Sequence, residues 1–180
     1  PFKAELVGIG LCWGEGLKDL AYIPIGHSAK ELIDSNTNMK QLLLEDVLCA
    51  LSPWLSDKEY PKVLQNTKYD RLVLLRHGIE LNGVVLDTLL ADYIRDSNSR
   101  HSLENMAYRE FGFSPISFKD IVLKGQTFAD VDIHTASLYC GMDVYLTRRL
   151  SFLLKDQINK LGVNLLGILE NIEQPLEQVL

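Results

Sequence analysis

The feature that most constrains the fold of this sequence is a helical pattern that runs without interruption over about 131–161. In "LYCGMDVYLTRRLSFLL", certain side chains recur at intervals of four, three, four and three, which places them on one face of a helix. They are Tyr139, Asp143, Leu146, Leu150 and Leu153. The stripe predicts a long helix with its apolar face in a core and one carboxylate, Asp143, inside that face.

A carboxylate on an apolar face needs an explanation, because an unpaired buried carboxylate either stays protonated or binds a cation. For Asp143, one interpretation is that it accepts hydrogen bonds from a neighbouring loop or a distant lysine. The other is a cation site. Asp70 poses the same question in "LQNTKYDRLVLL", where Val73 and Leu74 share its predicted helix face.

Shorter patterns place the long helix in an α/β domain. Two β-rich runs, 4–13 and 19–27, flank a glycine-containing turn and predict an antiparallel pair. Helical spacing predicts further helices over about 39–54, 68–78, 88–96, 102–112 and 117–125, with short strands at 61–66 and 83–88. Strand and helix alternate after the opening hairpin, which predicts a mixed sheet flanked by helices.

The last residues form a separate pattern that begins at Gly162 and Gly167. It is amphipathic despite Pro175, with one apolar face made of Ile168, Ile172, Leu176 and Val179. We therefore expect a new element to start here.

Composition excludes several classes of protein. A formal net charge of -6 argues against nucleic-acid binding through bulk positive charge, although a local site stays open. No apolar run approaches the roughly 20 residues that span a bilayer, so we expect a cytoplasmic protein with no membrane partner. Cys12, Cys49 and Cys140 are odd in number and lie in apolar contexts, which predicts buried, reduced thiols.

Two aspartates on separate helices favour a metal site, because clustered carboxylates are what hard cations such as Mg²⁺ require. Paired ions can activate water and stabilise the leaving oxygen of a phosphodiester. Tyr139, one turn before Asp143, lies on the same side and could orient a water; the alternative is a core aromatic ring. Gln65 and Asn66 follow a predicted strand beside Asp70, where they could contact a nucleic acid or simply form a turn.

At this point the sequence resembles the 3′–5′ exonuclease (proofreading) domain of bacterial family A DNA polymerases, the DNA polymerase I family. "QNTKYD" is similar to the second exonuclease motif of that family, and "YCGMD" is similar to the third, a Tyr-x-x-x-Asp. The segments "GIELNGVVLDTLLADYI", "SRHSLENMA", "LVGIGL" and "AYIPIGH" resemble its connecting segments, and "ENIEQPLEQVL" resembles the helix that opens the polymerase region. The resemblance covers essentially the whole chain.

The resemblance implies a ribonuclease H-like fold in which four acids hold two divalent ions (Mg²⁺, with Mn²⁺ or Zn²⁺ as alternatives) and nucleotides are removed from a DNA 3′ end. On that basis Asp70 and Asp143 are two of the four metal-site acids, and Tyr139 orients the water. The residues expected to contact single-stranded DNA are Gln65, Asn66, Tyr69, Arg100 and Phe118. For Arg100 a solvated surface position remains an alternative, and for Phe118 a core ring.

One part of the family pattern is absent. The first motif, Asp-x-Glu on the first strand, does not occur in this chain, and the resemblance would place it immediately before Pro1. We therefore expect residues 1–161 to form an exonuclease domain without its first, interior strand, with unpaired sheet edges and no activity in isolation. Residues 162–180 would be the linker and first helix of the polymerase region.

Other acidic residues have simpler interpretations. Asp87 stands at a strand-to-helix junction, which predicts a helix N-cap rather than a metal ligand. Asp130 and Asp132 precede the long helix, where negative charge suits the helix dipole. No histidine spacing suits zinc.

Two other functions remain open. A catalytically silent exonuclease-like module could scaffold the polymerase, and a free-standing ribonuclease of the same superfamily is a third hypothesis. The expected partners are a single-stranded DNA 3′ end and the polymerase region of the same parent chain, near the bacterial nucleoid.

Overall fold

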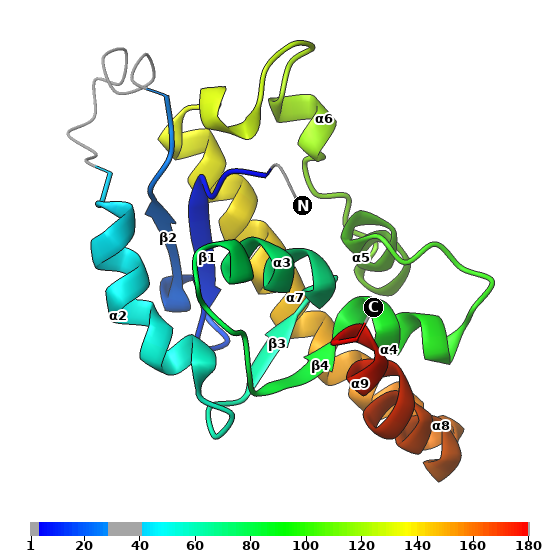
Figure 1. Ribbon diagram of the computed structural model, residues 1–180. Helices are drawn as coiled ribbons and strands as arrows, with labels where there is room; N and C mark the ends of the chain where they lie inside the picture. The colour runs from blue at the N-terminus through cyan, green and yellow to red at the C-terminus, as the bar shows by residue number, and fades with distance from the viewer. Residues whose placement is uncertain (1–3, 29–40, 180) are drawn as a thin grey trace.

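The computed structural model describes residues 4–28 and 41–179. Its central element is α7 (Ile133–Leu161), which runs behind the other elements in Figure 1. Asp132 caps its first turn by accepting a hydrogen bond from the Thr135 amide at 2.9 Å, and Gly162 ends it with φ of 136°. The long helix predicted over 131–161 is therefore confirmed, and its buried face includes Leu146, Leu150, Leu154 and Ile158.

The predicted hairpin is also confirmed. β1 (Gly8–Cys12) pairs antiparallel with β2 (Leu20–Pro24), from Gly8 opposite Pro24 to Cys12 opposite Leu20. Both strands contact α7. A Cβ at Gly10 would lie 3.1 Å from Cγ1 of Val144 on α7, so the absent side chain lets the strand approach the helix closely.

The second pair of strands is parallel. β3 (Lys62–Leu64) pairs with β4 (Val84–Asp87), and α3 (Thr67–Arg76) connects them. The prediction of one mixed sheet is wrong for the described residues, because the strands form two separate two-stranded sheets, β1–β2 and β3–β4. Both pairs pack on α7, and no strand of the described part pairs with both β1 and β3.

Helices cover these sheets. The helices α2 (Leu44–Ser56), α4 (Thr88–Arg95) and α5 (Leu103–Phe111) match the predicted segments, although residues 39–40 of the first prediction lie outside the described part. The helix expected over 117–125 is shorter: α6 spans only Phe118–Ile121, because the backbone turns extended at Val122. None of the described helices is long and apolar enough to cross a membrane.

The chain continues after Gly162 with α8 (Val163–Ile168), a π-helical turn (Leu169–Glu173) and α9 (Gln174–Glu177). The expected apolar face does not pack on the domain, since Ile168, Ile172, Leu176 and Val179 are all exposed. The neighbouring Leu169 is fully buried instead. It joins a core cluster that also contains Leu86, Ala91, Met106, Leu150, Leu154 and Ile158.

A second core cluster lies between α2 and α3. Its buried members are Leu55, Leu74, Ile79 and Leu81. The two clusters hold the β3–α3–β4 unit between α2 on one side and α7 with α4 on the other (Figure 1).

Candidate active site

The segment that carries the first group of candidate residues is the junction between β3 and α3. Asn66 has a left-handed backbone, with φ of 61°, which turns the chain sharply into the helix. The buried carboxylate of Asp87 accepts hydrogen bonds from the amides of Asn66, at 3.1 Å, and Thr67, at 2.7 Å. Asp87 thus fixes the start of the helix that carries Tyr69 and Asp70.

Asp87 has a second role at the other helix. Its carboxylate also accepts from the Leu89 amide at 2.9 Å, which confirms the predicted N-cap of α4. One buried side chain therefore caps α3 and α4 together, and it is engaged by backbone amides rather than available as a metal ligand.

The residues predicted to contact DNA on this segment differ in whether their side chains are accessible to a ligand. Gln65 is held by the domain itself: its amide donates to the His101 carbonyl at 3.1 Å and accepts from the Thr88 hydroxyl. Asn66 and Tyr69 are exposed, with 44% of the Tyr69 surface accessible. Both side chains are therefore placed where a ligand could reach them.

Asp70 is not buried as its helix face suggested. Val73 and Leu74 on that face are buried, whereas Asp70 keeps access to solvent. Protein nevertheless surrounds its carboxyl group closely enough that burial, with the nearby Asp87 carboxylate second, raises its pKa to about 7. No described residue donates a hydrogen bond that would offset this penalty.

Asp143 forms a second group of candidate residues on α7. It is half-buried, and burial raises its pKa to about 7 despite a hydrogen bond from the Tyr139 hydroxyl; the charge of Glu104 adds to the rise. Burial and the Asp143 carboxylate hold the pKa of Tyr139 above its usual range, so its hydroxyl stays a donor. The Tyr139 hydroxyl and the Asp143 carboxylate therefore form one hydrogen-bonded unit.

Aromatic rings border this unit. Phe118 stacks on Phe128 with 6.0 Å between ring centroids, and the Tyr139 ring lies 6.5 Å from Phe118 and 5.9 Å from Phe128. Phe118 is 47% exposed, so it is a surface ring at the edge of the site rather than a core ring. Arg100 is also exposed, in the loop between α4 and α5.

The cysteines do not contribute to this chemistry. All three are free thiols, as predicted, but the prediction that all are buried is wrong because Cys49 is exposed on α2. Burial raises the pKa of Cys140, beside Tyr139, to about 12, so this thiol stays protonated.

The described residues do not complete a metal centre. Within 4–28 and 41–179, no three His, Cys, Asp or Glu side chains are grouped so that they could hold an ion. Asp70 and Asp143 lie on separate helices, and each has a pKa of about 7, so each is only partly ionised at neutral pH and a bound cation would favour its charged form. A two-ion site requires more ligands than these two carboxylates supply.

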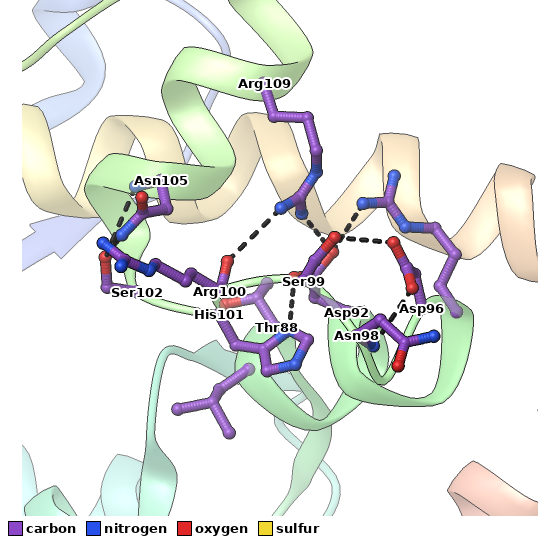
Figure 2. Close-up of polar contacts among 12 residues, drawn as sticks. Thr88, Asp92, Asp96, Asn98, Ser99, Arg100, His101, Ser102, Asn105 and Arg109 are labelled. Carbon is purple, nitrogen blue, oxygen red and sulfur yellow. Dashed lines mark hydrogen bonds and ion pairs between the residues drawn. The ribbon is translucent and has the colours of Figure 1, made fainter.

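Sequence reasoning missed three acidic side chains around these groups. Glu104 adds to the negative field at Asp143 and Tyr139. Asp92, which Figure 2 shows with Arg109 and His101, and Glu110 belong to a partly buried network that joins α4, α5 and α7. The only signal in the sequence was Arg95 three residues after Asp92, a spacing that allows an ion pair on one helix.

Comparison with known proteins gives the family. A family model described as 3′–5′ exonuclease matches residues 17–159. The chain belongs to the 3′–5′ exonuclease family. Over its whole length the chain is 43% identical to DNA polymerase I of Synechocystis sp., and over 99% of it 36% identical to DNA polymerase I of Pseudomonas aeruginosa. The chain spans 17% and 19% of those two proteins, so it corresponds to one segment of each.

A solved structure agrees with the fold. The "POL domain of Pol1 from M. smegmatis complex with DNA primer-template and dNTP" matches 76% of this chain and 21% of that chain, with a TM-score of 0.61 and 22% sequence identity. The likeness concerns the arrangement of the backbone. It supports an α/β exonuclease domain, as the family predicts.

Proposed function

We propose that the chain is the metal-dependent 3′–5′ exonuclease domain of a bacterial DNA polymerase I, which removes nucleotides from DNA 3′ ends during replication and repair. The exonuclease domain would comprise residues 1–161, and residues 162–180 would be the linker and start of the polymerase region. The observation that carries the proposal is a pair of carboxylates, Asp70 and Asp143, in a chain of the 3′–5′ exonuclease family. Burial raises the pKa of each to about 7, as expected for acids whose charge a bound cation would stabilise.

In this proposal Asp70 and Asp143 are two of the ligands of a divalent-ion site, and the remaining ligands lie outside the described part of the chain. Mg²⁺ is the expected ion, with Mn²⁺ or Zn²⁺ as alternatives; when bound it would supply activated water and stabilise the leaving oxygen. Tyr139 positions the Asp143 carboxylate through its hydroxyl and faces the attacking water. This residue can act as a donor throughout the physiological pH range because its pKa is raised.

The substrate would be a single-stranded DNA 3′ end. Asn66 and Tyr69 at the start of α3, and Phe118 at the aromatic edge, are exposed and can stack on or hydrogen-bond to nucleotides. Arg100 can bind a phosphate. Gln65 would contribute less directly, since its amide is engaged with His101 and Thr88.

A silent scaffold is the alternative function. It is favoured by the absence of a three-acid group in the described part of the chain, but the intact Tyr139–Asp143 hydrogen bond favours catalysis. The two functions predict different results in one nuclease assay.

The test is digestion of a 5′-labelled single-stranded DNA in Mg²⁺ by the full-length protein that contains this chain, compared with its Asp143→Ala variant. We expect stepwise shortening from the 3′ end and a loss of at least about 100-fold in the variant, since even the outer partners of metal ligands are worth 10–100-fold. Asp156→Ala is a matched control, because Asp156 is an exposed acid on the same helix that pairs only with Lys160.

Two results would contradict the proposal. If the wild-type protein folds but leaves the DNA whole, the domain is a scaffold. If the Asp143→Ala variant digests DNA as fast as the Asp156→Ala control, Asp143 is not part of the site.

A further inference from the structure

The network in Figure 2 is centred on Asp92, whose side chain on α4 is fully buried. Its Oδ1 accepts hydrogen bonds from Arg95, at 2.7 Å, and from Arg109 on α5, at 2.5 Å. Its Oδ2 lies 2.7 Å from Nδ1 of His101, which must carry the proton because an ionised carboxylate can only accept. Three donors from α4, α5 and the loop between them therefore meet on one carboxylate.

This network holds the backbone at Arg100 and at the residue after it. Arg109, held by Asp92, donates through its other terminal nitrogen to the Arg100 carbonyl at 3.3 Å. His101, also held by Asp92, accepts at its own carbonyl from the Gln65 amide at 3.1 Å. Gln65 at the end of β3 thus contacts the Arg100 loop directly, and the Asp92 carboxylate holds the same loop through the His101 ring and Arg109.

The Arg100 side chain takes no part in the network. It is exposed and extends away from Asp92 in Figure 2, whereas its backbone is held by the contacts just described. A long cationic side chain on a fixed backbone is suited to binding an anion such as a DNA phosphate, because less conformational freedom is lost on binding.

Asp92 differs from the other acid of the network in what depends on it. Glu110 pairs with Arg95 at 2.6 Å and with Arg109 at 3.0 Å, so both arginines would keep a carboxylate partner without Asp92. Among the described residues, the His101 ring would keep only its edge-on contact with Tyr93, at 5.5 Å between centroids. Replacing Asp92 would therefore mainly affect His101 and the segment that carries Arg100.

We infer that Asp92 is a positioning residue for DNA binding: by holding His101 and Arg109 it sets the segment that carries Arg100, so that the Arg100 side chain can bind the phosphodiester backbone of the substrate. The inference rests on the proposed exonuclease function and deepens it. Asp92 itself is buried and touches no substrate.

The test compares Asp92→Asn with Glu110→Gln in the full-length protein, using a 5′-labelled single-stranded oligonucleotide. Both changes remove one buried negative charge from the same network, so both should lower the melting temperature. Only Asp92→Asn should raise KM, by about 10-fold, the equivalent of one lost charge-assisted hydrogen bond, while kcat stays within about two-fold. His101→Ala, which cuts the same link without removing a charge, should raise KM similarly even if the Asp92 variant does not fold.

A double-mutant cycle separates positioning from general stability. If Asp92 acts through Arg100, then Asp92→Asn should add little to the KM of Arg100→Ala. Full additivity of the two changes, or an unchanged KM in both Asp92→Asn and His101→Ala, would overturn the inference. If the wild-type protein neither binds nor digests DNA, the proposed function itself has failed, which is a different result from an active enzyme that is insensitive to Asp92.

Discussion

Two pairs of aspartates in this domain differ in a way that exposure alone does not predict. Asp87 and Asp92 are almost completely buried, at 3% and 0% exposure, yet each accepts three hydrogen bonds. Asp70 and Asp143 are more accessible, yet both have a pKa raised to about 7. The free-energy cost of burying a carboxylate here depends on the number of its hydrogen-bond donors more than on its depth, and the acids with few donors are the ones available for chemistry.

The largest loss of stability is expected when Asp87, the acceptor shared by three backbone amides, is removed. Asp87→Ala leaves the amides of Asn66, Thr67 and Leu89 without their acceptor and removes the cap of two helices. We expect a loss of about 3 kcal/mol in the free energy of unfolding, measured by urea denaturation. Asp87→Asn, which keeps one oxygen, should lose less. A loss below about 1 kcal/mol in the free energy of unfolding of the alanine variant would contradict the view that the hydrogen bonds of Asp87 outweigh the cost of its burial.

Removing the charge of a partly buried acid with a single partner should have an effect on stability between those of the two pairs of aspartates. Glu177 on α9 holds Arg71 through two hydrogen bonds, at 2.9 and 3.0 Å, and both side chains are largely shielded, at 9% and 15% exposure. We expect Glu177→Gln to cost about 2 kcal/mol, less than a fully buried pair. The control is Glu170→Gln, an exposed position on the preceding turn, whose denaturation midpoint should match the wild-type protein.

Replacing an acid that has few hydrogen-bond donors should stabilise the domain rather than destabilise it. The pKa of Asp143 is about 7 in the folded domain and 3.8 in an unfolded chain, so the native state binds more protons between these values and loses stability as pH rises through them. In EDTA at pH 8, Asp143→Asn should therefore raise the free energy of unfolding by about 1 kcal/mol, discounted because the group is only half-buried. The gain should shrink at pH 5. Asp156→Asn, a change at an exposed acid of the same helix, is the control for the substitution itself. Equal gains for Asp143→Asn at both pH values would contradict the assignment.

The smallest effect is expected at Asp70. Its pKa is raised in the same direction, but its access to solvent screens the penalty, so Asp70→Asn in EDTA should stabilise the domain at pH 8 by less than about 0.5 kcal/mol. The measurement is the same denaturation series. A gain larger than that of Asp143→Asn would show that Asp70 is the more deeply desolvated of the two.

Local patterns predicted much of this fold. Apolar spacing indicated α7 and the hairpin, and the position of Asp87 between strand and helix indicated its cap, because these features depend on residues close in the chain. The division of the strands into two sheets was not predicted, because it depends on which strands lie side by side.

The same distinction applies to the candidate site. Asp70, Tyr139 and Asp143 could be named from helical spacing and from the family resemblance, but the engagement of Gln65 with His101 and Thr88 could not. Asp92 binds Arg109, 17 positions away, and apart from the i,i+3 spacing of Arg95 its partners carry no local signature. Contacts of this kind become visible only when the helices are placed in three dimensions.

The attachment of α9 has a mechanical consequence. Gln174 binds the β4 backbone through Val85 and Asp87, and Glu177 binds Arg71, the residue directly after Asp70. A displacement of this C-terminal segment must either break the Arg71–Glu177 pair or pull α3 with it. Motion of α9 would therefore shift α3 as one rigid helix and move the Asp70 backbone with it. The shift would pass directly from α9 to α3 through the Arg71–Glu177 pair.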